Sequence, residues 1–255
     1  MYLEQKINPG MGDVATFPAG GNCEPDTCAS CAVRSQAVCA KLNIGALQEL
    51  NQIGRHRTLR KGQTLIWEGD DASLVANVLE GMVKLSSGTS AGTEQILGLA
   101  GPGRFIGRPD GGTSGHSVVA LVDTKLCVFP TASFRTFMES HPEVGFALLD
   151  KAMDELDIAR RWQLMLARAS ASERVAALLL HFAGTSPREG NAYIFPLSRG
   201  QMADLAGLTI ETVSRQLTRL KTSGVISLPT RDSFKLLDLD ELISIAGEGP
   251  MRDLH

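Results

Sequence analysis

The chain has 255 residues, of which 43% are hydrophobic and 21% charged, and its net charge is −3. This composition allows a packed core, is too balanced for a disordered chain, and with this length suggests one or two domains. The longest apolar run, residues 175–180, is far shorter than the roughly 20 residues of a membrane-spanning helix. The first ten residues lack the pattern of a secretory signal, so we expect a cytoplasmic protein with no membrane partner.

Cysteine placement is the most informative feature of the N-terminal segment, residues 1–43. Four of the five cysteines fall within 17 residues and one lies far away: Cys23, Cys28, Cys31 and Cys39, then Cys127. In a reducing compartment, clustered thiols indicate metal ligands before they indicate disulfides. Residues 1–22 are rich in Gly, Pro and small side chains, and we expect them to be poorly ordered.

The next segment, residues 44–140, begins with a predicted helix over residues 44–53, and the sequence pattern changes after it. Short apolar runs such as TLIWEG, ANVLEGMVKL and KLCVF alternate with glycines between Arg60 and Pro130. Short strands with turn signals at this spacing indicate an antiparallel barrel or jelly roll. We therefore predict an α+β protein whose N-terminal sensory domain is a β jelly roll.

Helical periodicity begins at residue 141 and predicts one long helix over residues 141–169. One stripe along it consists of Leu149, Ala152, Leu156, Ala159, Gln163 and Leu166. A second stripe consists of Ile158, Trp162 and Met165. A helix of about 25 residues with two apolar seams is too long and too apolar to serve only as the cover of one barrel. We expect one seam to pack on its own barrel and the first stripe to join two copies as a homodimer. The alternative is a helix buried between two domains of one chain.

The C-terminal unit, residues 170–255, starts with a helix that we expect Ser172 to cap and that runs through Phe182. Further along, Ser198 and Gln201 form a capping box, which opens another short helix. This second helix is followed by a tight Gly-Leu-Thr turn. Such a turn predicts a third helix packed across the second.

Thr209 is placed to cap that third helix, which is predicted to run to about Ser223. Four residues are spaced to face inward: Ile210, Val213, Leu217 and Leu220. The opposite face carries Glu211, Ser214, Arg215 and Thr218. Two short helices joined in this way form a helix-turn-helix unit, whose second helix enters the major groove of DNA. The hairpin predicted in GVISLPTRDSFKLL would make it a winged helix-turn-helix domain.

The exposed face of the recognition helix has suitable chemistry for double-stranded DNA. Arg215 can bond to guanine in a bidentate manner, and Glu211 can accept from the amino group of cytosine. The other side chains that we expect at the DNA are Ser214, Thr218, Arg199, Thr209, Thr212 and Arg219. Residues 197–236 contain six basic and three acidic side chains, so the module is net positive within an acidic chain. The alternative is an ordinary helical hairpin with a solvated polar face.

The segment LSRGQMADLAGLTIETVSRQLTRLKTSGVI resembles the DNA-binding motif of the cyclic-AMP receptor superfamily, and KGQTLIWEGDDASLVANVLEGMVKL resembles its sensory jelly roll. Within that superfamily, ETVSR is similar to the reader of the fumarate-and-nitrate-reduction (FNR) branch. The resemblance implies a homodimer that binds palindromic promoter sites such as TTGAT-N4-ATCAA and works with RNA polymerase. The stretch GRFIGRPDGGTSGHSVVAL lacks the Glu-x-x-Arg-Ser-Ala run of the cyclic-nucleotide site, so we expect no cyclic nucleotide.

Iron–sulfur clusters are commonly held by four thiolates, and Cys28-x2-Cys31-x7-Cys39 supplies three. By the FNR resemblance, the strand cysteine Cys127 is the fourth ligand of an oxygen-labile 4Fe-4S cluster, and Cys23 is spare. The seven-residue gap before Cys39 is longer than the best-known FNR pattern and suits the FnrL/FnrN-like subgroup. The resemblance thus implies an oxygen-sensing transcription regulator that is active under anaerobic conditions, and not an enzyme.

Other interpretations of the cysteines stay open. The four N-terminal thiols alone are able to form a zinc site, or the thiols act as redox sensors without a cluster. Cys127 in an apolar strand also fits simple core packing. The spacing Cys23-x4-Cys28-x2-Cys31 differs by one residue from that of radical-SAM enzymes, and no strand–helix barrel follows it.

A mechanism follows from the cluster hypothesis. A cluster would tie the N-terminal segment to the strand that precedes the long helix, and so influence how that helix presents its dimer seam. Asp154, Glu155 and Asp157 lie near the front of the helix, and pairing two copies is expected to bring like charges together. Loss of the cluster in oxygen would then weaken the dimer and the affinity for DNA.

Overall fold

The computed structural model describes residues 28, 30–88, 94–186 and 188–247. The expectations for residues 1–22 and for Cys23 lie outside the described residues. Within the described chain, we find no helix that combines the length and the apolar character needed to cross a membrane.

The cysteine-bearing segment leads through a short 3-10 helix, η1 (Arg34–Gln36), into α1 (Ile44–Ile53). The side chain of Asn43 caps α1 by accepting a hydrogen bond from the Ala46 amide at 2.9 Å. The inner face of α1 buries Ala46, Leu47, Leu50 and Asn51. The bounds of α1 agree with the helix predicted over residues 44–53.

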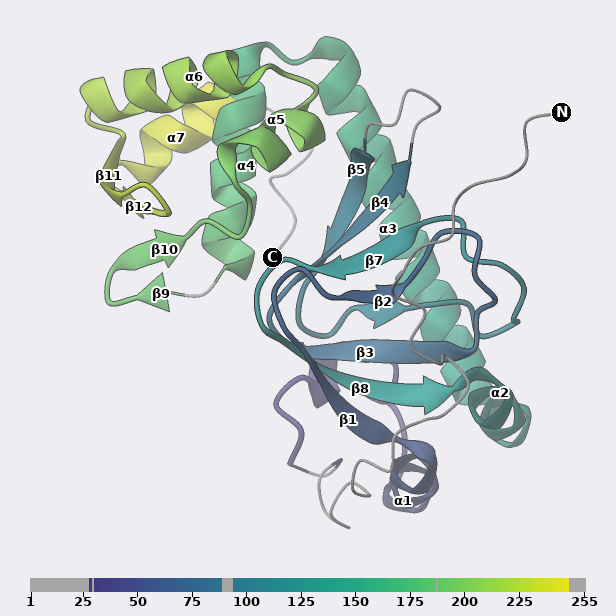
Figure 1. The fold of residues 1–255 in the computed structure, drawn as a ribbon. Coiled ribbons are helices and arrows are strands. Elements are labelled where there is room, and N and C mark those ends of the chain that lie inside the picture. The colour runs from purple at the N-terminus through teal and green to yellow at the C-terminus, as the bar shows by residue number, and fades with distance from the viewer. Residues whose placement is uncertain (1–27, 29, 89–93, 187, 248–255) are drawn as a thin grey trace, which may run out of the picture.

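Residues 55–130 form the predicted jelly roll from two four-stranded antiparallel sheets (Figure 1). The strands are β1 (Arg55–Leu59), β2 (Thr64–Ile66), β3 (Leu74–Glu80), β4 (Val83–Gly88), β5 (Glu94–Ala100), β6 (Phe105–Ile106), β7 (Ser117–Ala120) and β8 (Thr124–Pro130). One sheet has the order β1-β8-β3-β6 and the other β2-β7-β4-β5. Val78, Val118 and Leu126 are among the fully buried side chains between the sheets. The jelly-roll prediction is therefore confirmed.

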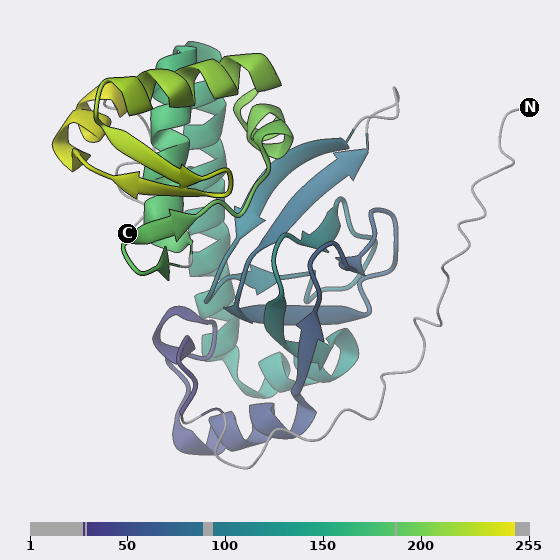
Figure 2. The ribbon, with the colours of Figure 1, turned by 60° about the vertical axis from the view of Figure 1, so that its left-hand side comes forward.

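The outer face of the β1-β8-β3-β6 sheet has its own apolar cluster. Residues on a strand alternate between faces, so Leu126 and Val128 point into the barrel while Cys127 and Phe129 point outward. The N-terminal segment, α1 and α2 (Thr131–Ser140) cover this outer face at the end of the molecule away from α6 (Figure 2). The cysteine-bearing segment thus packs against the strand that carries Cys127.

The long helix α3 (Pro142–Arg168) runs past the barrel and leads to α4 (Ala171–Thr185). It buries Val144, Ala147 and Met165 within its own chain. The six positions of the predicted dimer stripe, Leu149, Ala152, Leu156, Ala159, Gln163 and Leu166, are all exposed in the protomer. The first stripe is therefore exposed as predicted. Trp162 and Met165 of the second stripe pack on α4, whereas the barrel was the expected partner.

The predicted cap of α4 was wrong. Ser170, not Ser172, caps the helix in a capping box with Glu173: its hydroxyl accepts from the Glu173 amide at 3.3 Å, and Glu173 accepts from the Ser170 amide. The reason is the residue three positions on, since a glutamate can complete the box whereas Val175 cannot. The helix also extends beyond Phe182 to Thr185.

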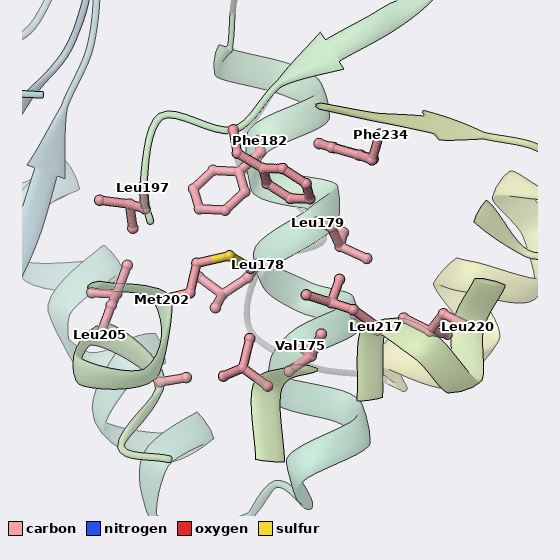
Figure 3. Packing of buried hydrophobic residues seen from close by; sticks show 14 of the residues in the cluster. Val175, Leu178, Leu179, Phe182, Leu197, Met202, Leu205, Leu217, Leu220 and Phe234 are labelled. Atoms are coloured by element: carbon pink, nitrogen blue, oxygen red, sulfur yellow. The ribbon is translucent and has the colours of Figure 1, made fainter. Parts of the chain in front are cut away.

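The C-terminal unit packs a small sheet and three helices against α4. Its further elements are β9 (Arg188–Glu189), β10 (Ala192–Ile194), α5 (Arg199–Ala206), α6 (Ile210–Thr222), β11 (Ile226–Thr230), β12 (Ser233–Leu236) and α7 (Leu239–Ala246). Phe182, Met202, Leu217 and Phe234 converge on the core around α4 (Figure 3). The sheet has the order β11-β12-β10-β9, so the predicted hairpin is present with two strands added beside it.

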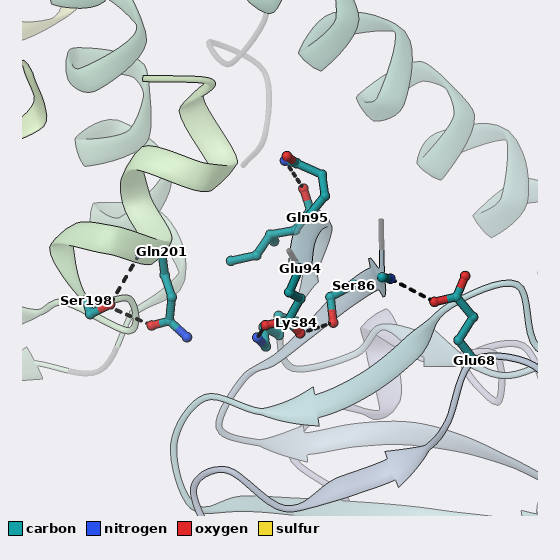
Figure 4. Close-up of polar contacts among 9 residues, drawn as sticks. Glu68, Lys84, Ser86, Glu94, Gln95, Ser198 and Gln201 are labelled. Atoms are coloured by element: carbon teal, nitrogen blue, oxygen red, sulfur yellow. Dashed lines mark hydrogen bonds and ion pairs between the residues drawn. The ribbon is translucent and has the colours of Figure 1, made fainter. Parts of the chain in front are cut away.

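The barrel and the C-terminal unit meet at the β4–β5 hairpin. Met82, Ile96 and Leu121 of the barrel belong to the same apolar cluster as the core around α4. Gln95 on β5 also donates to the backbone carbonyl of Asp204 on α5 at 2.9 Å. At the neighbouring position, Glu94 pairs with the buried Lys84 and accepts from Ser86 (Figure 4). Gln95 thus joins the hairpin to α5, and Glu94 joins its two strands to each other.

Candidate DNA interface and cysteine site

Helices α5 and α6 form the helix-turn-helix unit, and local signals fix both of their ends. Ser198 accepts from the Gln201 amide at 3.2 Å, and Gln201 accepts from the Ser198 amide at 2.9 Å (Figure 4). Gly207 ends α5 at φ +60°, a left-handed conformation that favours glycine. Thr209 then caps α6 by accepting from the Thr212 amide at 3.2 Å.

The inner face of α6 agrees with the predicted spacing at three of four positions. Val213, Leu217 and Leu220 are buried against the core. Ile210 was predicted to face inward but is 52% exposed. It is the first residue of α6 and lies over Gly200, where a Cβ would stand 3.7 Å from the Ile210 Cδ1. The helix start is therefore held by the turn and by its cap, and the burial begins one turn later.

The outer face of α6 presents the predicted reader residues to solvent. Glu211, Ser214, Arg215 and Thr218 are all exposed, as is Arg219. Neither Ser214 nor Arg215 uses its side chain in a hydrogen bond or ion pair within the described chain, so both are available to a ligand. The backbone amide of Glu211, and then the Thr209 hydroxyl, lower the pKa of the Glu211 carboxyl. It is an anionic acceptor at neutral pH.

The threonines of α6 are already used within the helix. The Thr218 hydroxyl donates to the backbone carbonyl of Ser214 at 2.9 Å. At the start of the helix, the hydroxyl of the capping residue Thr209 donates to the hydroxyl of Thr212 at 3.1 Å. Their hydroxyl oxygens still have acceptor capacity. Their placement favours supporting roles, while Glu211 and Arg215 project their functional groups from the exposed face.

Arg199 lies at the start of α5 and contacts the wing. Its guanidinium stacks on the ring of Phe195 at 4.4 Å and donates to the carbonyl of Arg231 at 3.4 Å. Burial, opposed by the charge of Asp232, lowers the pKa of Arg199. The side chain holds the β11–β12 turn against α5, so its predicted contact with DNA would be combined with a structural role.

Three of the four predicted cluster ligands come together on the outer face of the barrel sheet. Cys39 and Cys127 are buried in one apolar cluster, and the half-buried Cys28 packs against it. Cys31 is half-buried as well, and it is close enough to Cys39 to influence its titration. Residues more than 80 positions apart in the sequence thus meet at a single place.

Among the described residues, no group of three His, Cys, Asp or Glu side chains is arranged to hold a metal ion. Burial, and then the neighbouring Cys31, raises the pKa of the Cys39 thiol, while its own backbone amide and Arg34 act in the opposite direction. A metal would therefore have to displace a proton from Cys39. Three thiols at one apolar cluster, with Cys31 near Cys39, are a donor set of the right chemistry for a group held by thiolates.

Sequence reasoning missed how the acidic residues of α3 are paired. Glu155 forms an ion pair with Arg104 of the barrel at 2.8 Å, and Asp157 pairs with Arg160 at 3.3 Å. Two of the three acids predicted to repel their copies across a dimer thus have a counterion in their own chain, which reduces the expected repulsion. The i,i+3 spacing of Asp157 and Arg160 is visible in the sequence, but the Arg104 contact depends on the fold.

Comparison with known families and structures agrees with this architecture. Residues 56–141 match the cyclic nucleotide-binding domain, and residues 173–245 match the Crp-like helix-turn-helix domain. The structure of FixK2 from Bradyrhizobium japonicum superposes with a TM-score of 0.70 at 27% identity, covering 76% of this chain and 97% of that one. A jelly roll followed by a long helix and a winged helix-turn-helix unit defines a DNA-binding transcription regulator rather than an enzyme.

Sequence relatives identify the family. The transcriptional activator protein FnrL of Cereibacter sphaeroides is 40% identical over 228 residues, which cover 87% of this chain and 92% of FnrL. The nitrogen fixation regulation protein FixK of Bradyrhizobium diazoefficiens is 37% identical over 207 residues, or 79% and 86% of the two chains. The chain belongs to the CRP/FNR family of transcriptional regulators.

Proposed function

We propose that this protein is an oxygen-responsive transcription activator that holds a 4Fe-4S cluster through Cys28, Cys31, Cys39 and Cys127. In this proposal it dimerises through α3 while the cluster is intact, and the dimer binds palindromic sites of the TTGAT-N4-ATCAA type under anaerobic conditions. Its other partner is RNA polymerase, it takes no cyclic nucleotide, and it acts in the cytoplasm. The FnrL-like relatives support the oxygen-responsive class.

The observation that carries this proposal is that Cys28 packs against the apolar cluster in which Cys39 and Cys127 are buried. A lone buried cysteine is ordinarily core packing, but three thiols from two distant segments on one sheet face are better explained by a shared ligand. When bound, a 4Fe-4S cluster supplies an iron centre whose stability depends on its thiolates and on access of oxidants. The apolar residues around Cys39 and Cys127 would limit that access.

The chain's own residues provide the link to DNA. Cysteines on the N-terminal segment and on β8 would fix η1 against the barrel, next to the turn that carries Arg104. Arg104 pairs with Glu155 of α3. The exposed stripe of α3 would then pack on a second copy, and two α6 helices in one dimer are needed to read two half-sites one helical turn apart.

The test is the visible absorption spectrum of protein purified without oxygen, with iron and acid-labile sulfide assays before and after exposure to air. We expect about four iron and four sulfide per chain, a broad band near 400 nm that bleaches in air, and anaerobic binding to a TTGAT-N4-ATCAA duplex that is lost with the band. Cys28→Ala and Cys127→Ala should each abolish the band, whereas Cys23→Ala should retain it.

Two results would favour the other candidates. A colourless protein with one zinc per chain, unaffected by Cys127→Ala, would indicate a structural zinc site formed by the N-terminal thiols. A metal-free protein whose DNA binding responds to thiol oxidants would indicate a redox sensor without a cluster. DNA binding that ignores all four cysteines would overturn the sensing proposal and retain only the regulator.

A further inference from the structure

Two buried asparagines lie at the cysteine site. Asn51 on α1 is 7% exposed and Asn77 on β3 is 3% exposed. Buried carboxamides are costly in an apolar cluster unless they bind something. Each of these two lies beside a different predicted ligand.

Asn51 contacts the first of these cysteines directly. The Cys28 thiol donates to the Asn51 Oδ1 at 3.4 Å, a contact that spans 23 residues of chain. Asn51 occupies the face of α1 that also buries Ala46, Leu47 and Leu50 in the apolar cluster around Cys39 and Cys127. The burial of these neighbours holds this face of α1 against the cluster. The amide is therefore held in place by the fold.

Asn77 is the cross-strand partner of Cys127. The antiparallel register of β3 and β8 pairs Asn77 with Cys127 and Val75 with Phe129. Directly opposed residues share a face, so the Asn77 side chain lies on the outer face with Cys127. Its Oδ1 is buried and has no hydrogen-bond partner in the described part of the chain. An orphaned amide oxygen of this kind calls for an explanation, because it leaves a desolvation cost unrepaid.

A carboxamide can serve both the metal-free and the metal-bound thiol. A protonated thiol is a donor and suits the amide oxygen, as seen for Cys28 and Asn51. A ligating thiolate can only accept, and a half-turn of the amide about its last side-chain bond presents N–H donors instead. Hydrogen bonds to ligand sulfurs orient them and tune the bound group.

We propose that Asn51 and Asn77 are positioning residues that donate amide hydrogen bonds to the ligating sulfurs of Cys28 and Cys127. This inference rests on the proposed function, since it assumes that these cysteines are ligands. It goes beyond that function by assigning a second layer of residues that stabilises the ligated state from two different elements, α1 and β3.

The experiment compares full-length protein, purified without oxygen, with Asn51→Leu, Asn51→Asp and Asn77→Leu. Both substitutions remove the amide N–H donors. Leucine keeps the volume of the side chain, and aspartate keeps its shape. In each Leu variant we expect the 400 nm band to decay about tenfold faster under a fixed oxygen concentration and under an iron chelator. The midpoint reduction potential should become more negative, because a hydrogen bond to a ligand sulfur stabilises the more negatively charged, reduced cluster and each Leu variant removes one.

Gln52→Leu is the matched control, because Gln52 is the exposed amide next to Asn51 on the same helix. It should decay like the wild type. Thermal unfolding of the metal-free proteins separates a folding defect from a lost hydrogen bond, and a Leu variant is informative when its metal-free form is as stable as the wild type. If a variant is destabilised, its midpoint potential decides instead.

Two failures are distinguishable. Wild-type protein without iron and sulfide would overturn the cluster proposal itself. Wild-type protein with a cluster, and Leu variants with unchanged decay and unchanged potential, would overturn the role of the asparagines alone. The role of Asn51 would also be overturned if the 400 nm band of Asn51→Asp decayed like that of the wild type while that of Asn51→Leu decayed faster. Aspartate retains the shape of asparagine but lacks its N–H donors.

Discussion

Arg104 and Glu155 form an ion pair of 2.8 Å that joins the turn between β5 and β6 to the middle of α3. Both side chains are partly exposed, at 29% and 47%, so the pair adds at most about 1 kcal/mol to stability. Its position is more informative than its energy. Glu155 is adjacent to Leu156 of the exposed stripe, so the pair links the barrel to the helix face that is expected to bind a second copy.

The other side of the same turn contacts the cysteine-bearing segment. Gly103 has a φ of +81°, and a Cβ at this position would stand 2.7 Å from the Cβ of Gln36 in η1. Gln36 lies between Cys31 and Cys39 in the sequence, so this contact joins the cysteine-bearing segment to the turn. Gln36, Gly103, Arg104 and Glu155 thus form a continuous chain of neighbours from the cysteines to α3.

Replacing Gly103 by alanine should break this chain. The left-handed backbone alone costs an alanine roughly 1–2 kcal/mol, and the contact with Gln36 adds to that. Gly62→Ala is the matched control, because Gly62 has a φ of +84° and nothing within 4 Å of its Cβ position. Urea unfolding should show the larger loss for Gly103→Ala, and equal losses in the two variants would mean that η1 does not rest on the turn.

The α3 stripe yields a prediction about assembly. Leu156 is 41% exposed in the protomer, so Leu156→Asp should leave the fold of the protomer intact. Across a dimer seam, the same change would bury an unpaired charge, and we expect dimer dissociation to become at least about 100-fold easier. Sedimentation of anaerobic protein should then show monomers, together with weak binding to a palindromic duplex.

Leu164→Asp is the control for assembly, since Leu164 is 57% exposed on a different side of α3. It should sediment as the wild type. Monomers from Leu164→Asp and dimers from Leu156→Asp would place the interface on the other exposed face and contradict the stripe.

Sequence patterns predicted helices well where the residues that determine the ends and the buried face lie close together in the chain. The capping box of Ser198 and Gln201, the cap at Thr209 and the spacing of Val213, Leu217 and Leu220 lie within a few residues of the elements they fix. They predicted α5 and α6 closely because helix ends and amphipathic faces are set by such neighbours. The misplaced cap at Ser172 was an error of the same local kind, corrected by the glutamate three residues after Ser170.

Contacts between distant segments were beyond the sequence. Asn77 meets Cys127 because β3 and β8 pair in one particular register, and a slip of one residue would move either side chain to the barrel interior. Gln95 reaches Asp204 across 109 residues of chain. Strands β9 and β10 are only two and three residues long, too short to produce a periodic signal.

The reader face of α6 gives a prediction about base recognition. Arg215→Ala should weaken binding to a TTGAT duplex by about 1–3 kcal/mol and should remove the preference for guanine at its position. Arg219→Ala is the comparison, since Arg219 is exposed further along the helix, where a phosphate contact is expected. Arg219→Ala should weaken binding to all duplexes by the same factor. The salt dependence of binding should correspond to about one fewer neutralised phosphate. Fluorescence anisotropy with single-base variants of the duplex measures both.

The pattern of loss identifies the role of each arginine. If Arg215→Ala weakens binding to every duplex by the same factor, Arg215 contacts the backbone and the proposed base reading is incorrect. If Arg219→Ala changes the base preference instead, the two roles are exchanged.

His181 on α4 makes the stability of the protein depend on pH. Burial, and then the charge of Arg104, lowers the pKa of His181 to about 4. The unfolded chain takes up this proton below about pH 6.5, whereas the folded chain does not until about pH 4. The stabilisation is therefore complete above pH 6.5 and is lost as the pH falls towards 4. Between pH 7 and pH 5 the loss from this group amounts to about 2 kcal/mol.

His181→Leu should remove this share of the acid sensitivity. The Nδ1 of His181 is buried without a hydrogen-bond partner in the described part of the chain, so leucine leaves no polar group behind and should be tolerated at pH 7. Urea midpoints at pH 7 and pH 5 measure the difference between the two proteins. His116, whose pKa burial also lowers, is present in both and contributes equally. Parallel losses in wild type and His181→Leu would show that His181 titrates alike in the folded and unfolded chains.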